Sequence, residues 1–154
     1  MSWRARVLTL ALCLLVSGCS GGSTPRPTLV VREIDGVGPV LATDSGQALY
    51  VFAPDARRSV TCHDQCAGTW PPLFTASGGT AAVAGGARAD LVAADDDQGH
   101  RVVTYGGWPL YTYLPDRPGH ATGQAIDLNG GYWYVLRADG TPLVPAGQPP
   151  LQGR

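Results

Sequence analysis

The chain has 154 residues and a formal net charge of −1, and its 11 basic residues are all Arg. With no basic surplus to neutralise phosphates, the composition argues against nucleic acid as a partner, and 44% apolar residues exclude a disordered polyelectrolyte. The 21 Gly and 13 Pro favour turns and short strands over long helices.

Residues 1–18 are predicted to be an export signal. Two Arg precede a run of ten uncharged, almost wholly apolar residues from Val7 to Val16. A helix of this length rises about 15 Å, half the thickness of a bilayer core, so the run predicts a signal peptide and not a membrane span. Val16-Ser17-Gly18-Cys19 follows, and it resembles the lipobox of bacterial lipoproteins.

The lipobox resemblance implies cleavage before Cys19 and a thioether-linked diacylglycerol on its sulfur. Two or more acyl chains suffice for stable anchoring, so we expect a lipoprotein on the extracytoplasmic side of a cell membrane, either periplasmic or on the outer face. The alternative is an ordinary secretory signal with a chance Cys. Residues 19–28 are rich in Gly, Ser, Thr and Pro, which predicts a flexible, lipidated tether.

The body of the chain contains an internal repeat. Residues 40–55 align without a gap to residues 101–116, at an offset of 61 and with six identities. Downstream, residues 68–73 match residues 131–136 at an offset of 63. Two matches in the same order predict a duplicated unit.

The duplication sets the predicted domain boundaries. Repeat 1 spans about 29–75 and repeat 2 about 90–145, so the β domain covers 29–145. Residues 146–154 are predicted to be a disordered tail.

Each repeat is predicted to contain a hairpin and a further strand. In repeat 1, residues 40–43 and 47–53 flank Asp44-Ser45-Gly46, and Gly supplies the positive φ that a tight hairpin requires. The fold class is therefore all-β and antiparallel, with two pseudo-equivalent hairpin-plus-strand repeats packed as one small sandwich- or barrel-like domain. The other expected strands are residues 101–105, 108–114, 132–136 and 142–144, with weaker candidates at 28–33 and 90–94.

Alternation along the second strand of each hairpin predicts two faces. Tyr50 and Phe52 share one side of their strand, and Leu49 and Val51 share the other. Pro54 has no N–H and ends the strand.

The doubled Tyr-x-(Phe/Trp/Tyr)-x-x-Asp motif resembles that of a bacterial secreted-repeat lipoprotein family, over roughly residues 28–145. The resemblance implies little about mechanism, because that family is described as having no established function. His120 stands where an acidic residue often stands in the family, so no role is carried to that position. The two copies of the motif consist of Tyr50, Phe52 and Asp55, and of Tyr111, Tyr113 and Asp116.

Cys62 and Cys66 are the cysteines that remain free once the leader is removed and Cys19 is lipidated. An oxidising compartment favours a disulfide between them, which would close a small loop and contribute at most about 2 kcal/mol. Two alternatives stay open, a redox-active pair and a copper or zinc site that also uses His63.

Asp55 and Asp116 occupy the same position in both repeats. One interpretation is a carboxylate pair for acid–base chemistry or cation binding. The other is that each Asp closes the loop after its strand by accepting bonds from backbone N–H groups or a Tyr hydroxyl. Duplication favours the second interpretation, so no catalytic residue and no cofactor are predicted.

Trp108 is the candidate ligand-binding residue. It replaces Gln47 at a predicted hairpin tip, where we expect it to be exposed in a strip of aromatic side chains that could stack on sugar rings or a partner protein. The acidic run Asp95-Asp96-Asp97-Gln98-Gly99 is predicted to be a solvated turn before the strand at Arg101.

The sequence therefore predicts a membrane-anchored, non-catalytic module that binds or contacts an envelope protein or glycan. The alternative is an extracytoplasmic redox or metal-handling protein that uses the Cys-x3-Cys pair.

Overall fold

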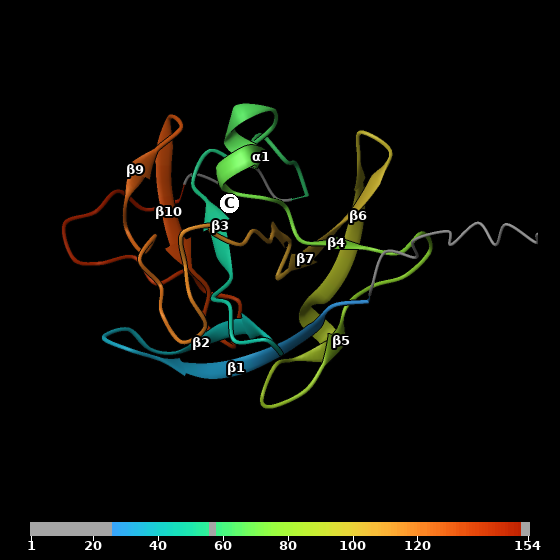
Figure 1. Cartoon of the computed structure of the whole chain (residues 1–154), viewed down its shortest axis with the longest axis horizontal. Helices are drawn as coiled ribbons and strands as arrows, with labels where there is room; N and C mark the ends of the chain where they lie inside the picture. The colour runs from blue at the N-terminus through green and yellow to red at the C-terminus, as the bar shows by residue number, and fades with distance from the viewer. Residues whose placement is uncertain (1–25, 56–57, 152–154) are drawn as a thin grey trace, which may run out of the picture.

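Figure 1 shows the computed structural model of the chain, which describes residues 26–55 and 58–151. The predicted signal peptide and Cys19 lie outside the described residues. The described part is nearly all β, as predicted, and contains no helix long and apolar enough to cross a bilayer. Its strands form three sheets that are not closed into a barrel.

The first sheet contains β1 (Thr28–Ile34), β2 (Gly38–Thr43) and β5 (Ala82–Val83). β1 pairs antiparallel with β2 over six residues and parallel with β5 over two. Gly36 turns the chain between β1 and β2 with a φ of 72°. β1 begins at Thr28, the last residue assigned to the tether from sequence, and it is the principal partner of β2.

The predicted hairpin between residues 40–43 and 47–53 forms, but only next to its turn. The Thr43 N–H donates to the Gln47 carbonyl at 2.9 Å and the Leu49 N–H donates to the Leu41 carbonyl at 3.0 Å, on either side of the antiparallel bridge between Ala42 and Ala48. Along its other edge β2 pairs over its full length with β1, and from Tyr50 onward the second arm of the hairpin leaves β2 to pair with another strand.

The second sheet repeats this plan with β6 (Val92–Asp97), β7 (His100–Tyr105), β8 (Trp108–Pro109) and β4 (Phe74–Thr75). β7 lies in the middle and pairs antiparallel with all three neighbours.

The turn predicted over residues 95–99 is shorter than expected, because its three aspartates, residues 95–97, are part of β6. They are paired residue by residue with β7, Asp95 opposite Val102 and Asp97 opposite His100. The turn is confined to Gln98 and Gly99, whose φ values are 46° and 82°.

The third sheet joins the two repeats. β3 (Tyr50–Phe52) from repeat 1 pairs antiparallel with β10 (Gly131–Val135) from repeat 2, which pairs in turn with β9 (Asp127–Leu128). Figure 1 shows β3 and β10 side by side. Repeat 1 therefore contributes one strand to each of the two sheets that contain the strands of repeat 2, β3 here and β4 in the second sheet.

Within the described ranges two short helices interrupt the strands, although the sequence predicted none. α1 (Gln65–Thr69) is five residues long, with Trp70 as its C-cap residue ahead of Pro71, and a 3-10 helix (Ala89–Leu91) precedes β6.

The core is divided into two clusters by the alternation of β3, as predicted. Leu49 and Val51 belong to one cluster, and Tyr50 and Phe52 belong to the other. The second cluster contains most of the aromatic rings.

Trp108 is buried in the first cluster with 5% of its surface exposed, so the prediction of an exposed ligand-binding residue is wrong. The hairpin tip beside it is covered by segments distant in sequence. Gly106 donates its N–H to the carbonyl of Leu91, and Gly140 lies against Gly106. A hairpin tip predicted from sequence is thus not exposed when other segments of the chain pack over it.

Residues 146–151 are held to the domain, which corrects the prediction of a disordered tail over residues 146–154 for that part, while residues 152–154 lie outside the described residues. The Tyr134 hydroxyl donates to the carbonyl of Pro149 at 3.0 Å, and Leu151 packs against the first cluster.

Candidate functional site

The two repeats meet at Tyr50 and Tyr111. The Tyr50 N–H donates to the Tyr111 carbonyl at 2.9 Å, and the Tyr111 N–H donates to the Tyr50 carbonyl at 3.0 Å. These tyrosines occupy equivalent positions, so the main chain pairs about an approximate twofold axis.

The tyrosine and aspartate side chains of the repeat motif form hydrogen bonds across this axis, from one repeat to the other. The Tyr50 hydroxyl donates to Oδ2 of Asp116 at 2.6 Å, and the Tyr111 hydroxyl donates to Oδ2 of Asp55 at 2.7 Å. Each tyrosine thus binds the aspartate of the other repeat.

The second carboxylate oxygen of each aspartate is occupied within its own repeat. Oδ1 of Asp55 accepts from the backbone N–H of Thr61 at 2.8 Å and from its hydroxyl at 2.6 Å. Oδ1 of Asp116 accepts the same two bonds from Thr122, at the same distances. Each aspartate closes its loop, the second of the two interpretations drawn from sequence.

Burial governs the ionisation of these groups. It raises the pKa of the Tyr50 phenol, and the hydrogen bond to the Asp116 carboxylate raises it further. Burial likewise raises the pKa of Tyr111, reinforced by the charge of Asp55. Burial also raises the pKa of Asp55, against the opposing hydrogen bonds from Thr61 and Tyr111. With both oxygens bonded to groups of the protein, neither aspartate offers an open site for acid–base chemistry on an external substrate.

Four aromatic rings stack beside the Tyr–Asp pairs. Tyr113 stacks on Trp70 at 4.0 Å between ring centroids, Trp70 on Trp133 at 3.9 Å, and Trp133 on Phe52 at 4.2 Å. The two indoles are parallel to within 1°. Tyr50 meets Trp70 edge-on at 5.1 Å, and Tyr111 meets Trp133 in the same way at the same distance. The motif residues therefore form the centre of the fold.

This stack depends on Gly123, the repeat 2 counterpart of Cys62. A Cβ at Gly123 would lie 2.5 Å from Cη2 of Trp70 and 3.1 Å from Tyr113. We expect Gly123→Ala to lower the free energy of unfolding by about 1–3 kcal/mol through overpacking. Gly68→Ala in α1 is the control, since its Cβ would meet nothing within 4 Å. Urea unfolding measures both, and equal effects would contradict the packing described.

Cys62 and Cys66 form a disulfide with a Cα–Cα distance of 5.2 Å, which confirms the pairing predicted from the compartment. Cys62 is fully buried in the second cluster, while Cys66 lies in α1 and is partly exposed. The disulfide fixes α1 against the aromatic centre of the fold.

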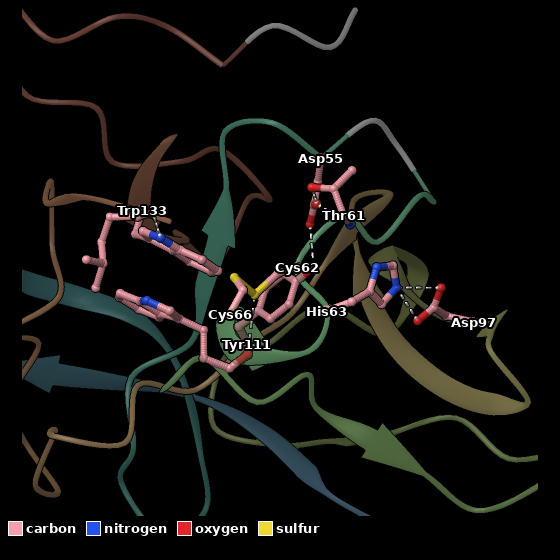
Figure 2. Close-up of a disulfide and its surroundings, with 10 residues drawn as sticks. Asp55, Thr61, Cys62, His63, Cys66, Asp97, Tyr111 and Trp133 are labelled. Carbon is pink, nitrogen blue, oxygen red and sulfur yellow. Dashed lines mark hydrogen bonds and ion pairs between the residues drawn. A yellow bond between two sulfur atoms is a disulfide. The ribbon is translucent and has the colours of Figure 1, made fainter. Parts of the chain in front are cut away.

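His63 points away from the disulfide, as Figure 2 shows. Its Nε2 lies 3.0 Å from Oδ2 of Asp97, at the end of β6, and so connects repeat 1 to repeat 2. Among the described residues, no group of three His, Cys, Asp or Glu side chains is arranged to hold a metal. His120 lies elsewhere, 3.8 Å from Asp35.

A pocket of about 170 Å³ lies beside this ion pair. It is lined by residues of both repeats, including Ala67 of α1, His63, Asp97, His100 and Phe74. His63 and His100, which are far apart in sequence, are thus brought together by the fold.

Two exposed apolar side chains flank α1. Phe74 lines the pocket and is 37% exposed, and Leu114 is 62% exposed next to Thr69, whose carbonyl accepts the Leu114 N–H at 3.1 Å. Neither residue was predicted from sequence to lie at a functional surface. A signal existed for Leu114, which stands where repeat 1 has Ala53, but none existed for Phe74.

The comparisons with known proteins agree with the duplicated architecture. A family model described as a secreted repeat of unknown function matches residues 34–74 and again residues 92–137. Neither a curated protein nor a solved structure matches the chain.

Proposed function

This chain belongs to the family of secreted repeats of unknown function, and from that premise we propose that it is a lipid-anchored, extracytoplasmic interaction module without catalytic activity. The lipobox at Cys19 supports the anchor. The family's secreted character agrees with an extracytoplasmic location.

The proposal rests on one observation: the polar and aromatic side chains of the repeated residues already have their partners within the protein. Both oxygens of Asp55 and of Asp116 are bonded, and the rings of Trp70 and Trp133 are fully buried. The duplicated residues build the fold, so contacts with other molecules must use the surface on which the repeats differ.

The face around α1 is that surface. We define the α1 face by α1 itself, the pocket beside it, and the exposed side chains of Phe74 and Leu114. Apolar side chains next to the carboxylates of Asp64 and Asp97 suit a protein partner with apolar and basic groups. A glycan partner has less support, because the aromatic residue expected to stack on sugars, Trp108, is buried.

Quantitative copurification from detergent-solubilised membranes tests this proposal. We expect Phe74→Ser and Leu114→Ser each to weaken recovery of the same partner protein by about tenfold, equivalent to about 1.4 kcal/mol. Leu128→Ser is the matched control, since Leu128 is 39% exposed but lies on β9. Loss of the partner with all three variants, or with none, would refute the α1 face as the contact surface.

The alternative, redox or metal handling through Cys62 and Cys66, has less support. A metal site would need His63 to face the sulfur atoms, and its ring is directed at Asp97 instead. Thiol counting and metal analysis on protein isolated from the envelope separate the two functions. We expect a closed, metal-free pair, whereas titratable thiols or bound metal would favour the alternative.

A further inference from the structure

The aromatic stack connects the protein surface to two buried phenols. Tyr113, at one end of the stack, is partly exposed, whereas Trp70, Trp133, Tyr50 and Tyr111 are fully buried. Successive rings from Tyr113 to Trp70 to Tyr50 are separated by 4.0 Å and 5.1 Å. The second route continues from Trp70 to Trp133 at 3.9 Å and then to Tyr111 at 5.1 Å.

Both routes end at a phenol that is hydrogen-bonded to a carboxylate. The distances are 2.6 Å for Tyr50 and Asp116 and 2.7 Å for Tyr111 and Asp55. A phenol is far easier to oxidise when a base accepts its proton at the same time, because the strongly acidic phenol radical cation is never formed. The carboxylates are placed to accept that proton.

We propose that the Tyr113–Trp70–Trp133 stack and the two Tyr–Asp pairs form an electron-transfer path by which this protein reduces one-electron oxidants, such as oxygen-centred radicals, that reach its surface. The proposal concerns the core of the fold and is independent of the α1 face.

The chemistry balances with one electron and one proton. The external oxidant takes one electron from Tyr113, the partly exposed end of the stack, and Tyr113 regains an electron from Trp70, so that the electron hole moves into the buried part of the stack. Tyr50 then gives its electron to the oxidised Trp70 and its phenolic proton to Oδ2 of Asp116. The products are a neutral tyrosyl radical, a neutral carboxylic acid and a restored indole.

The surroundings of the indoles favour transfer over loss of a proton. Among the described residues, Nε1 of Trp70 has no hydrogen-bond partner, and Nε1 of Trp133 donates to the carbonyl of Leu128, which is a poor base. An oxidised indole without a base keeps its proton, and it then remains oxidising enough to take an electron from a phenol bound to a carboxylate.

Tyr134 provides an internal comparison. Its hydroxyl donates to a backbone carbonyl, that of Pro149, and its ring stacks on Tyr132 at a centroid distance of 6.1 Å. Without a carboxylate to take the proton, this pair is a poor end point. Tyr50 and Tyr111, whose hydroxyls donate to carboxylates, are therefore better suited than Tyr132 and Tyr134 to hold the electron hole as a tyrosyl radical.

Flash photolysis with a photogenerated ruthenium(III) tris-bipyridine oxidant tests the path. Transient absorption and electron paramagnetic resonance distinguish indole radicals from tyrosyl radicals, and added ascorbate removes radicals exposed at the surface. In the wild-type protein we expect an indole signal that converts to a tyrosyl signal that persists in ascorbate.

The decisive variant is Tyr113→Phe. Phe52 already occupies the equivalent place in the stack, so the fold should accept this ring, and circular dichroism checks that it does. We expect Tyr113→Phe to lose most of the persistent tyrosyl signal, while Tyr132→Phe, the control outside the stack, retains it. The proposal is overturned if Tyr113→Phe and wild type give equal persistent signals, or if ascorbate removes the whole wild-type tyrosyl signal.

Discussion

Replacing Asp116 by Ala is expected to lower the free energy of unfolding by about 2–4 kcal/mol, because three donors then lose their acceptor: one is buried, at a cost of about 1–3 kcal/mol, and two lie on an exposed residue, where water replaces the acceptor at a lower cost. These donors are the Tyr50 hydroxyl, the Thr122 hydroxyl and the Thr122 N–H. Asp127→Ala is the control, because Asp127 is exposed on β9, and its effect should stay within about 0.5 kcal/mol. Urea unfolding followed by circular dichroism measures both variants.

A double-mutant cycle measures the interaction energy between Tyr50 and Asp116 separately from the bonds that Asp116 accepts from Thr122. Tyr50→Phe keeps the ring and removes one charge-assisted hydrogen bond, which should cost about 1.5–3 kcal/mol. Because Tyr50 bonds directly to Asp116, the double variant should lose less than the sum of the two single losses. Strict additivity would show that the exchanged pair does not couple the repeats.

The second large effect is expected for Trp133→Ala, about 3–5 kcal/mol through the cavity that it leaves in a fully buried stack. Trp133 contacts Trp70 and Phe52 face-to-face and Tyr111 edge-on. Thermal and urea unfolding both report the loss.

A matched pair of conservative variants tests how the two indoles differ. Nε1 of Trp133 donates to the Leu128 carbonyl at 3.0 Å, whereas Nε1 of Trp70 has no acceptor among the described residues. Trp133→Phe should therefore cost about 1–2 kcal/mol more than Trp70→Phe, since only the former removes a bond that is made. A larger loss of unfolding free energy for Trp70→Phe than for Trp133→Phe would contradict this difference between the two indoles.

Local pattern was sufficient to predict the fold class, the duplication and the two faces of β3. A period of two places Tyr50 and Phe52 together whatever the partner strands are, so this prediction needs no knowledge of the topology. The two predicted hairpins form next to their turns, where pairing is local. The longer ladders are non-local and were not predicted: β2 pairs along its length with β1, and β3 pairs with β10 of the other repeat.

The exchange of Tyr and Asp between repeats could not be predicted for a related reason. Tyr50 stands five residues before Asp55 and 66 residues before Asp116, and the repeated pattern is the same for either partner. Burial of Trp108 and exposure of Phe74 depend in the same way on segments distant in sequence. The disulfide was predictable because two cysteines are left after the predicted processing, and an oxidising compartment favours their pairing.

Intact-mass spectrometry of the protein purified from membranes tests the central claim, that a lipid anchor at the N-terminus holds an oxidised two-repeat domain outside the cytoplasm. We predict a chain that starts at Cys19, carries a diacylglycerol there, and gains no mass from a thiol-alkylating reagent until the disulfide is reduced. A chain that keeps residues 1–18 and an unmodified Cys19 would contradict the account.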